Sequence, residues 1–559
     1  MSARRSTTID CLAEDYIATL ARLSPIEATD MGIVGFDDQL DDFSPEGYAA
    51  RAEAASQTLL ALQAADPVDD TDEVTIAAMG ERLGLCIELY EASEHLRDVN
   101  VIASPLQSVR RVFDIMPTDT LADWEVISHR LAAVPDAIDG YMASLREGAH
   151  RGLTPALRQL ERASDQADHL AGAGSFWSWL AAEATADGAD LPETLTGELH
   201  RHARDAAAAY GDLTHALRQL APGAPNDDAF GRDRYALHSR HFLGAQVDLE
   251  DAYAWGIDEL HSITTEQASV AVEIGGPGTS IEAAIEILEG DPARHISGTE
   301  DLQAWMQSTS DEAMAALAGR HFDIPEPVRT LTCRIAPTTN GIMYYTGPSE
   351  DFSRPGTMWW SVPAGVTSFG TWREKTTVYH EGVPGHHLQM AHTVFRSELL
   401  NRWRRLACWV SGTGEGWALY AERLMASLGF LDDPGDRMGM LDAQRMRTAR
   451  VVLDIGVHLR LACPREWGGG TWDADKAWDF LRANSNEPEE FLSFELDRYL
   501  GWAGQAPAYK IGQRLWEDIR DESLAAGSDL KTFHARALDV GAVGLDVLRE
   551  ALAPRPPAG

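Results

Sequence analysis

Three histidines and one glutamate lie in the eight-residue segment His380-Glu381-Gly382-Val383-Pro384-Gly385-His386-His387. Imidazoles can hold a zinc ion, and a carboxylate beside them can take a proton from water that the metal activates. In the common zinc-hydrolase motif the two histidines are four residues apart, on one face of a helix. Here Pro384 occupies that position, and proline cannot bind a metal. The residue types therefore predict a zinc hydrolase with an unusual ligand spacing.

Pro384 and Gly385 explain how that spacing could work. On an ideal helix, His380 and His386 point about 120° apart. Proline lacks an N–H and clashes with the preceding turn, whereas glycine tolerates unusual dihedral angles, so we expect the helix to break or bulge here. A two-residue bulge brings His386 back towards His380 and makes it the favoured second ligand. His387 shares a face with His380 but lies about 10 Å further along an unbroken helix, and it is the alternative ligand.

A catalytic zinc site also needs a third protein ligand and an open position. Glu415 opens an apolar, helix-favouring run, and Glu422 follows seven residues later on the same face. Carboxylates on a buried helix face are costly unless they are paired or bound to a metal. Glu415 is therefore the predicted third ligand, and Glu422 either orients a ligand or contacts the substrate. The alternative for Glu415 is a helix N-terminal charge, although Gly414 and Gly416 beside it indicate a close approach to another group.

Further candidates lie downstream. Asp454 and His458 are four residues apart and share a helix face, which suits either a pair that orients a metal ligand or an exposed helical pair. Tyr509 could donate a hydrogen bond to the oxyanion of a hydrolytic reaction, and Arg498 could bind a substrate carboxylate. The alternatives are a core tyrosine and a surface arginine.

Three strings of residues resemble the bacterial DUF885 family, which is grouped with the gluzincin-type metallopeptidases. They are His380-Glu381-Gly382-Val383-Pro384-Gly385-His386-His387-Leu388-Gln389, then Glu415-Gly416-Trp417-Ala418-Leu419-Tyr420-Ala421-Glu422, then Arg498-Tyr499 with Gly504-Gln505-Ala506 and Tyr509-Lys510-Ile511-Gly512. The resemblance covers most of the chain and implies His380, His386 and Glu415 as metal ligands. It also implies Glu381 as the general base. The family's Pro-Gly-Gln-Ala appears here with Ala503 in first place, and Pro507 follows where the family has a small or polar residue.

Helices must position these residues, because apolar side chains recur at three and four spacing from residue 8 to about 320. We expect helices over 14–23, 46–65, 75–96, 123–147, 155–171, 192–220, 249–275 and 445–461. Between about 329 and 363 short strands are predicted at 330–335 and 357–362, with turns at Asn340-Gly341 and 348–356. This sheet would offer either a peptide-binding edge or a plain hairpin. The predicted fold is mainly α: a large multi-helix, metallopeptidase-like fold with a small β-sheet next to the active-site helix.

Composition excludes several classes of protein. The 559 residues carry a net charge of −40, which argues against nucleic acid as a partner. No segment has about 20 uninterrupted apolar residues, so no membrane span is expected. We see no secretory signal in residues 1–25, and the five cysteines are odd in number and scattered, which fits a reducing cytoplasm.

Together these features predict a zinc-dependent peptidase with one zinc ion per chain and short peptides as substrates. Residues 1–325 would form one helical side of the cleft and 326–559 the zinc-binding catalytic region, closely packed as one continuous domain. A carboxypeptidase would need Arg498 or Lys510 for the terminal carboxylate, and an aminopeptidase would need Glu422 for the terminal amine. The rival functions are a zinc hydrolase of a non-peptide amide or ester, and an inactive binding protein of the same fold. The sequence leaves a homodimer open.

Overall fold

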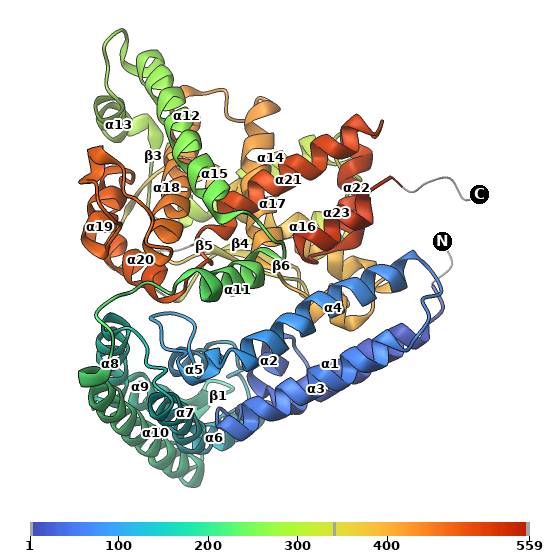
Figure 1. Ribbon diagram of the computed structural model, residues 1–559, viewed down its shortest axis with the longest axis vertical. Helices are drawn as coiled ribbons and strands as arrows, with labels where there is room; N and C mark the ends of the chain where they lie inside the picture. The colour runs from blue at the N-terminus through green and yellow to red at the C-terminus, as the bar shows by residue number, and fades with distance from the viewer. Residues whose placement is uncertain (1–3, 339–342, 555–559) are drawn as a thin grey trace.

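The computed structural model describes residues 4–338 and 343–554. The fold is mainly α-helical, as predicted, and carries only a few small sheets. Figure 1 shows the early helices, blue to teal, below the later ones, with α11 (Arg232–Leu243) between the two groups.

Four helices begin the chain, and side-chain caps define where they start. They are α1 (Thr8–Leu23), α2 (Pro25–Asp30), α3 (Pro45–Gln63) and α4 (Asp70–Glu91). The side chains of Thr7, Ser44 and Asp69 each accept a hydrogen bond from a backbone N–H of the first turn that follows. Such caps satisfy N–H groups that have no partner inside a helix. The predictions at 14–23, 46–65 and 75–96 are therefore confirmed, with shifted ends.

The next helices build a second apolar cluster of their own. They are α5 (Pro105–Arg111), α6 (Leu121–Ala132), α7 (Val134–His150), α8 (Leu157–Ala171), α9 (Phe176–Ala182) and α10 (Glu193–Leu220), with a two-stranded hairpin of β1 (Thr185–Ala186) and β2 (Ala189–Asp190). Buried side chains from Ile26 to Leu217 form this cluster. The single helix predicted over 123–147 is wrong. It divides at Ala133, because Pro135 has no N–H to continue the hydrogen-bond ladder and stands in the first turn of a new helix.

A three-stranded sheet precedes the histidine segment. Its strands are β4 (Leu331–Ile335), β5 (Met343–Thr346) and β6 (Gly356–Trp360), in the order β4-β6-β5, with β4 and β6 parallel. The strands predicted at 330–335 and 357–362 are thus confirmed, whereas β5 between them was not predicted. The predicted turn at Asn340-Gly341 lies outside the described residues. The side chain of Gln307 accepts from Cys333 N–H and donates to Leu331 O, both at 2.9 Å, so a helix side chain occupies the outer edge of β4.

The remaining helices and a second small sheet lie between residues 249 and 552. They are α12 (Leu249–Gly275), α13 (Ile281–Glu289), α14 (Thr299–Leu317), β3 (His295–Ser297) and β7 (Ser368–Gly370), followed by α15 (Thr371–Glu381), α16 (His386–Phe395), α17 (Ser411–Ser427), α18 (Pro434–His458), α19 (Ala474–Ala483), α20 (Glu489–Gly501), α21 (Ala508–Ala525), α22 (Leu530–Val540) and α23 (Leu545–Leu552). In this region α15 packs on α17 and α18, and α17 packs on α21. The helix predicted over 445–461 is the second half of α18.

One large apolar cluster joins both ends of the chain. It contains Ile9 of α1, Met79 of α4, Trp417 of α17 and Leu548 of α23. The boundary expected near residue 325 therefore does not divide this cluster, although it stays a prediction whether the two regions behave as separate units.

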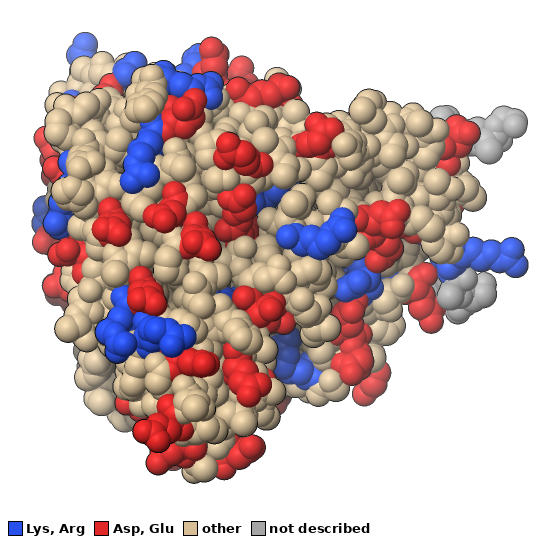
Figure 2. Space-filling view, turned by 90° about the horizontal axis from the view of Figure 1, so that it is seen from below, with Lys and Arg blue, Asp and Glu red and all other residues tan. Residues whose placement is uncertain are grey.

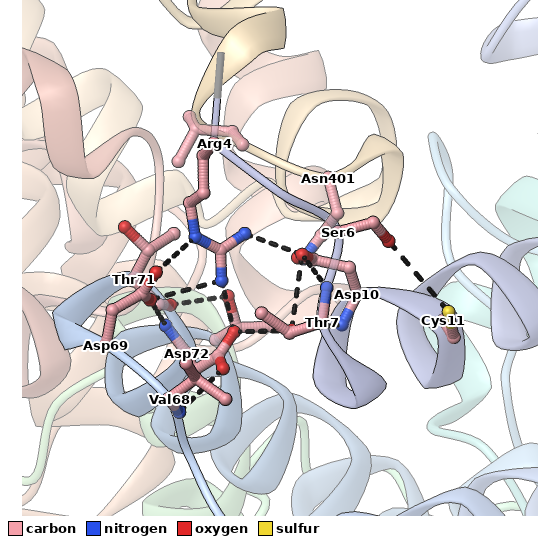
Figure 3. A network of polar contacts seen from close by, with 12 residues as sticks. Arg4, Ser6, Thr7, Asp10, Cys11, Val68, Asp69, Thr71, Asp72 and Asn401 are labelled. Atoms are coloured by element: carbon pink, nitrogen blue, oxygen red, sulfur yellow. Dashed lines mark hydrogen bonds and ion pairs between the residues drawn. The ribbon is translucent and has the colours of Figure 1, made fainter. Parts of the chain in front are cut away.

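Polar contacts reinforce the same junction. The guanidinium of Arg4 lies among three carboxylates and contacts Asp10 and Asp69 at 2.6 Å, with Asp72 beside them (Figure 3). Asp10 in turn accepts a hydrogen bond from Asn401 Nδ2 at 3.1 Å. The first helix is thereby fixed to the segment that follows α16.

The surface carries mixed charge. Figure 2 shows acidic and basic side chains interspersed on one face, without a continuous basic area there. Among the described residues, none of the helices combines the length and apolarity that a membrane crossing requires.

Candidate metal centre

The predicted helix break lies between α15 and α16. Helix α15 ends at Glu381 and α16 begins at His386, so His380 lies in the last turn of one helix and His386 in the first turn of the next. The Gly385 N–H donates to Tyr379 O, six residues back, and the His387 N–H donates to Gly382 O, five residues back, both at 3.1 Å. An unbroken helix would use a step of four. The connection thus takes up the extra residues that separate the two histidines.

Gly385 permits this connection because no side chain fits there. A Cβ at Gly385 would lie 1.8 Å from the carbonyl oxygen of His380. Trp417 of α17 holds the same segment, since its Nε1–H donates to Pro384 O at 2.8 Å. The sequence signal Pro-Gly therefore corresponds to a fixed, tightly packed turn.

The turn brings the two histidines together with Glu415 of α17. Glu415 Oε2 lies 3.4 Å from the Nε2 atom of His380 and 3.4 Å from the Nε2 atom of His386. A ligand atom of Glu381 completes a buried group with the two histidines, all within 4.8 Å of one another. Within residues 4–338 and 343–554, these three form the one such group of metal-binding side chains.

The spacing of these atoms fits a metal ion. Two ligands that are each about 2.05 Å from a tetrahedral zinc lie about 3.4 Å apart. Glu415 Oε2 is buried and makes no hydrogen bond, although two imidazoles face it. A buried carboxylate oxygen without a donor is costly unless a cation is bound to it. His380, His386 and Glu415 would therefore hold the ion, and their imidazole and carboxylate groups suit zinc.

Charges in the site favour an anionic Glu415. Burial alone would raise the pKa of Glu415, but the two imidazoles that face its carboxylate, those of His380 and His386, hold this pKa well below its usual value. Burial raises the pKa of Glu381 above its usual value, and the nearby histidines oppose that shift. The two glutamates thus differ as a metal ligand and a proton acceptor should.

Glu422 occupies the opposite side of His380. Its Oε1 lies 2.8 Å from His380 Nδ1, and its side chain is fully buried. Gln444 donates to its other oxygen at 3.3 Å. Of the two predicted roles, the structure therefore favours orientation of His380, because Glu422 is buried and both its oxygens are engaged. The role as a substrate contact stays a prediction.

His387 points away from this group. Its Nε2 lies 2.7 Å from Val328 O, and the Tyr345 hydroxyl lies 3.0 Å from its Nδ1. Burial lowers the pKa of His387 to about 4, so the ring is neutral. Both nitrogens of His387 are occupied, and the structure brings His386 rather than His387 to Glu415. Through Tyr345, His387 also ties β5 to α16.

Glycines place Glu415. It lies in the second turn of α17, beyond the first-turn position where a helix N-terminal charge would lie. A Cβ at Gly414 would lie 2.2 Å from the ring of Trp409, and a Cβ at Gly416 would lie 2.5 Å from the backbone of Gly512 in α21. The close approach expected from the two glycines is therefore present: Gly414 lies against the indole of Trp409, and Gly416 lies against the backbone of α21.

Tyr509 and Trp409 border the same site. Tyr509 lies in the first turn of α21, and burial, followed by the charge of Glu415, raises its pKa to about 12. Its hydroxyl therefore keeps its proton at neutral pH. Trp409 is 40% exposed, and its ring centroid lies 6.0 Å from that of His386.

Several other candidates have partners elsewhere. Arg498, expected to bind substrate or lie on the surface, is partly buried and donates to Glu495 at 2.8 Å and Gln505 at 2.6 Å. Lys510 is buried, and its Nζ contacts Glu259, Gln444 and Gln513. These contacts engage both cations inside the protein, and their substrate roles stay predictions.

Asp454 and His458 are buried and do not form the exposed pair that was the alternative. Asp454 Oδ1 accepts from Tyr235 at 2.7 Å and from Gly504 N–H at 3.1 Å, and His458 Nε2 lies 3.0 Å from Tyr499 O. Among the described contacts, none joins either residue to His380, His386 or Glu415. Their observed role is to hold the segment before α21 against α18.

Arg447 was missed by the sequence reasoning. Its NH1 atom lies 3.6 Å from Glu422 Oε1. Residues 447, 450, 454 and 458 are spaced by three, four and four, which is the spacing of one helix face. This polar stripe along the mostly apolar second half of α18 was the signal that could have identified it.

The fold and the site define a large helical protein whose candidate zinc ligands flank a Pro-Gly turn. The chain belongs to the family described as bacterial protein of unknown function (DUF885), which matches residues 25–552. The predicted family is thus confirmed, whereas its grouping with gluzincin metallopeptidases stays a prediction. No functionally curated protein matches the sequence.

Two solved structures share the fold. One is a protein from Colwellia psychrerythraea, described provisionally as a lipoprotein, with 22% sequence identity and a TM-score of 0.83 over 97% of this chain and 98% of that one. The other, from Shewanella oneidensis, is described provisionally as a lipoprotein of unknown function, with 15% identity and a TM-score of 0.73 over 98% of this chain and 99% of that one. At such identities the likeness concerns the fold alone.

Proposed function

We propose that the protein is a zinc-dependent peptidase that hydrolyses short peptides. One observation carries the proposal: Glu415 Oε2 lies 3.4 Å from the Nε2 atoms of both His380 and His386, with the Glu381 carboxyl group beside them. A purely structural zinc site uses four protein ligands and has no need of an adjacent proton acceptor, so Glu381 favours catalysis.

In this proposal each residue has a distinct task. Bound zinc would polarise the peptide carbonyl and lower the pKa of water. Glu381 takes a proton from the attacking water and passes it to the leaving nitrogen, so that the C–N bond breaks and a carboxylate and an amine form. The Tyr509 hydroxyl donates a hydrogen bond to the carbonyl oxygen as negative charge develops there. Glu422 keeps His380 in the orientation that presents Nε2.

The proposal is tested by measuring zinc content and hydrolysis together. The purified protein, supplied with zinc, should bind about one ion per chain and cleave members of a panel of short peptides. Glu381→Gln should keep the zinc and lose about 100-fold or more in turnover, because the proton acceptor is gone. Glu300→Gln, at an exposed position in α14, is the matched control and should match the wild type.

Two results would contradict the proposal. Absence of zinc binding by the wild type, even in excess zinc, would favour a binding protein. Cleavage of amide or ester panels without cleavage of any peptide would favour a hydrolase of other substrates.

The location of the protein belongs with these proposals. A cytoplasmic location is predicted from the scattered cysteines, whereas both similar structures are described provisionally as lipoproteins, which points to the cell envelope. Fractionation of the native host, followed by detection of the protein in soluble or envelope fractions, distinguishes the two.

A further inference from the structure

A cavity of about 160 Å³ lies between α15, α18 and the segment before α20. Its wall includes Glu374 and Thr377 of α15, Arg447 and Arg450 of α18, and Glu487. Thr377 is four residues before Glu381 and so lies on the same face of α15. One helical turn, about 6 Å, therefore separates this wall from the proposed proton acceptor.

Arg447 and Arg450 are three residues apart and share a face of α18. The side chain of Arg447 is 15% exposed, and its buried NH1 makes no hydrogen bond; its nearest carboxylate oxygen, on Glu422, is 3.6 Å away. Arg450 gives one hydrogen bond to Glu495 at 2.9 Å, and its Nε is buried without a partner. Its guanidinium carbon is 5.3 Å from the centre of the Tyr509 ring. Two incompletely satisfied cations thus line the cavity, and one of them, Arg450, also lies against the Tyr509 ring.

The acidic groups of the cavity wall do not offer an unmatched charge comparable to that of the two arginines. Asp442 accepts from Asn486 at 2.6 Å and from Arg373 at 3.3 Å, so its charge is matched. Burial raises the pKa of Glu374 to about 7, so this group carries only part of a negative charge near neutral pH. Glu487 is exposed, and solvent screens its charge. The unsatisfied guanidinium groups therefore favour a carboxylate in the cavity.

We propose that Arg447 and Arg450 bind the C-terminal carboxylate of the peptide, so that the enzyme is a carboxypeptidase. This inference rests on the proposed peptidase function. A peptide advances about 3.5 Å per residue, so a carboxylate bound in the cavity beside Thr377, one helical turn from Glu381, lies one or two residues beyond the cleaved bond. The product released from this side is an amino acid or a dipeptide. The residues that the sequence offered for either terminus, Glu422, Arg498 and Lys510, are bound internally.

The test uses pairs of peptides that differ only at one end. An N-acetylated tripeptide of neutral residues is offered to the zinc-loaded enzyme with a free C-terminal carboxylate or with a carboxamide. We expect kcat/KM to be about 10 to 100-fold higher for the free acid, the range for a hydrogen bond to a charged group. Calorimetry with Glu381→Gln, which should bind without turnover, should show the same preference in Kd.

Variants assign the preference to the guanidinium groups. Arg447→Gln should reduce the acid-to-amide ratio by about tenfold, and Arg447→Lys should restore part of it. Arg437→Gln is the matched control, because Arg437 lies on the same helix and pairs with Glu273 at the exposed surface. Zinc content is measured in each variant, since Arg447 also contacts Glu422. If Arg447→Gln does not fold, Arg450→Gln serves as the test in its place, and it should lower the same acid-to-amide ratio.

The outcomes separate the two proposals. Equal hydrolysis of acid and amide by the wild type would overturn the carboxylate site and leave the peptidase function standing. A preference that survives in Arg447→Gln and Arg450→Gln would overturn the assignment to these residues. If the zinc-loaded enzyme hydrolyses neither of these peptides nor any other peptide, the peptidase proposal is overturned and the inference falls with it.

Discussion

His380 shows how one side chain is held by two carboxylates. Glu415 faces its Nε2 at 3.4 Å and Glu422 faces its Nδ1 at 2.8 Å, on opposite sides of the ring. Both glutamates come from α17, seven residues apart and so on one helix face. A carboxylate on Nδ1 fixes which nitrogen carries the proton and leaves Nε2 free to bind a metal.

Replacement of Glu422 should weaken zinc binding without removing a ligand. We expect Glu422→Gln to lower zinc affinity by about 10 to 100-fold, because the orienting carboxylate is lost. Competition with a chelator of known affinity measures the change. Asp454→Asn is the control: it removes another buried carboxylate, one that holds Tyr235 and Gly504, and should leave zinc affinity unchanged. Equal losses in both variants would mean that general destabilisation is responsible.

The two adjacent histidines should respond differently to removal. His386→Ala should lose most of the bound zinc, whereas His387→Ala should keep it. Loss of the His387 contacts to Val328 O and Tyr345 should instead cost about 1–3 kcal/mol in the free energy of unfolding. Elemental analysis and urea denaturation measure the two effects. If only His387→Ala loses its zinc, His387 and not His386 is the metal ligand.

At this scale the sequence identified the residues that belong to one local motif. Spacing around Pro384-Gly385 favoured His386 over His387, and the geometry agrees with that preference. It could not identify the partners of isolated polar residues. Arg498, Lys510 and Asp454 lie on suitable helix faces, but which buried group each one meets depends on packing between distant helices.

At the scale of the elements, the connection between α15 and α16 decides the site. We expect Gly385→Ala to abolish zinc binding or folding, since its Cβ would lie 1.8 Å from His380 O. Gly84→Ala in α4 is the control, because nothing lies within 4 Å of its Cβ. That control should be neutral or stabilising by about 0.5–1 kcal/mol. Circular dichroism and zinc content measure both variants, and a folded, zinc-binding Gly385→Ala would contradict the proposed constraint.

Element positions were largely predictable where periodicity was strong. The helix predicted over 249–275 coincides with α12, and those over 155–171 and 192–220 match α8 and α10 within two residues. The sheet was only partly predictable. Local pattern indicates β4 and β6, but their parallel pairing, with β5 on the far side, depends on long-range contacts that no local pattern specifies.

For the whole molecule, Glu94 joins two distant parts of the chain. It follows α4 and contacts Arg234 at 2.8 Å and His238 at 2.9 Å, both in α11. Burial alone would raise the pKa of Glu94, but hydrogen bonds from His238 and Arg234 hold this pKa at about 2. This pKa lies below the usual 4.5. The ionised Glu94 carboxylate therefore stabilises the fold fully above about pH 4.5, and this contribution is lost as the pH falls towards 2.

Glu94→Gln should therefore cost about 3 kcal/mol in the free energy of unfolding at pH 7, with the difference from wild type narrowing below about pH 4.5. Urea denaturation at several pH values measures this. Glu88→Gln is the matched control, since Glu88 also joins α4 to α11 but forms an exposed pair with Arg240. It should cost less than about 1 kcal/mol at every pH. A pH-independent cost for Glu94→Gln would contradict the shifted pKa.

The junction around α1 has a consequence for synthesis of the chain. Asp10 and its partner Asn401 are 391 residues apart. At a translation rate of about 5–20 residues per second, α1 waits about 20–80 s for that partner to leave the ribosome. During this time the second apolar cluster, from Ile26 to Leu217, can assemble, and α1 can pack on α3 and α4. The part of the large apolar cluster that comes from later helices is still missing, and the last helices made, α22 and α23, complete the core that the first one began.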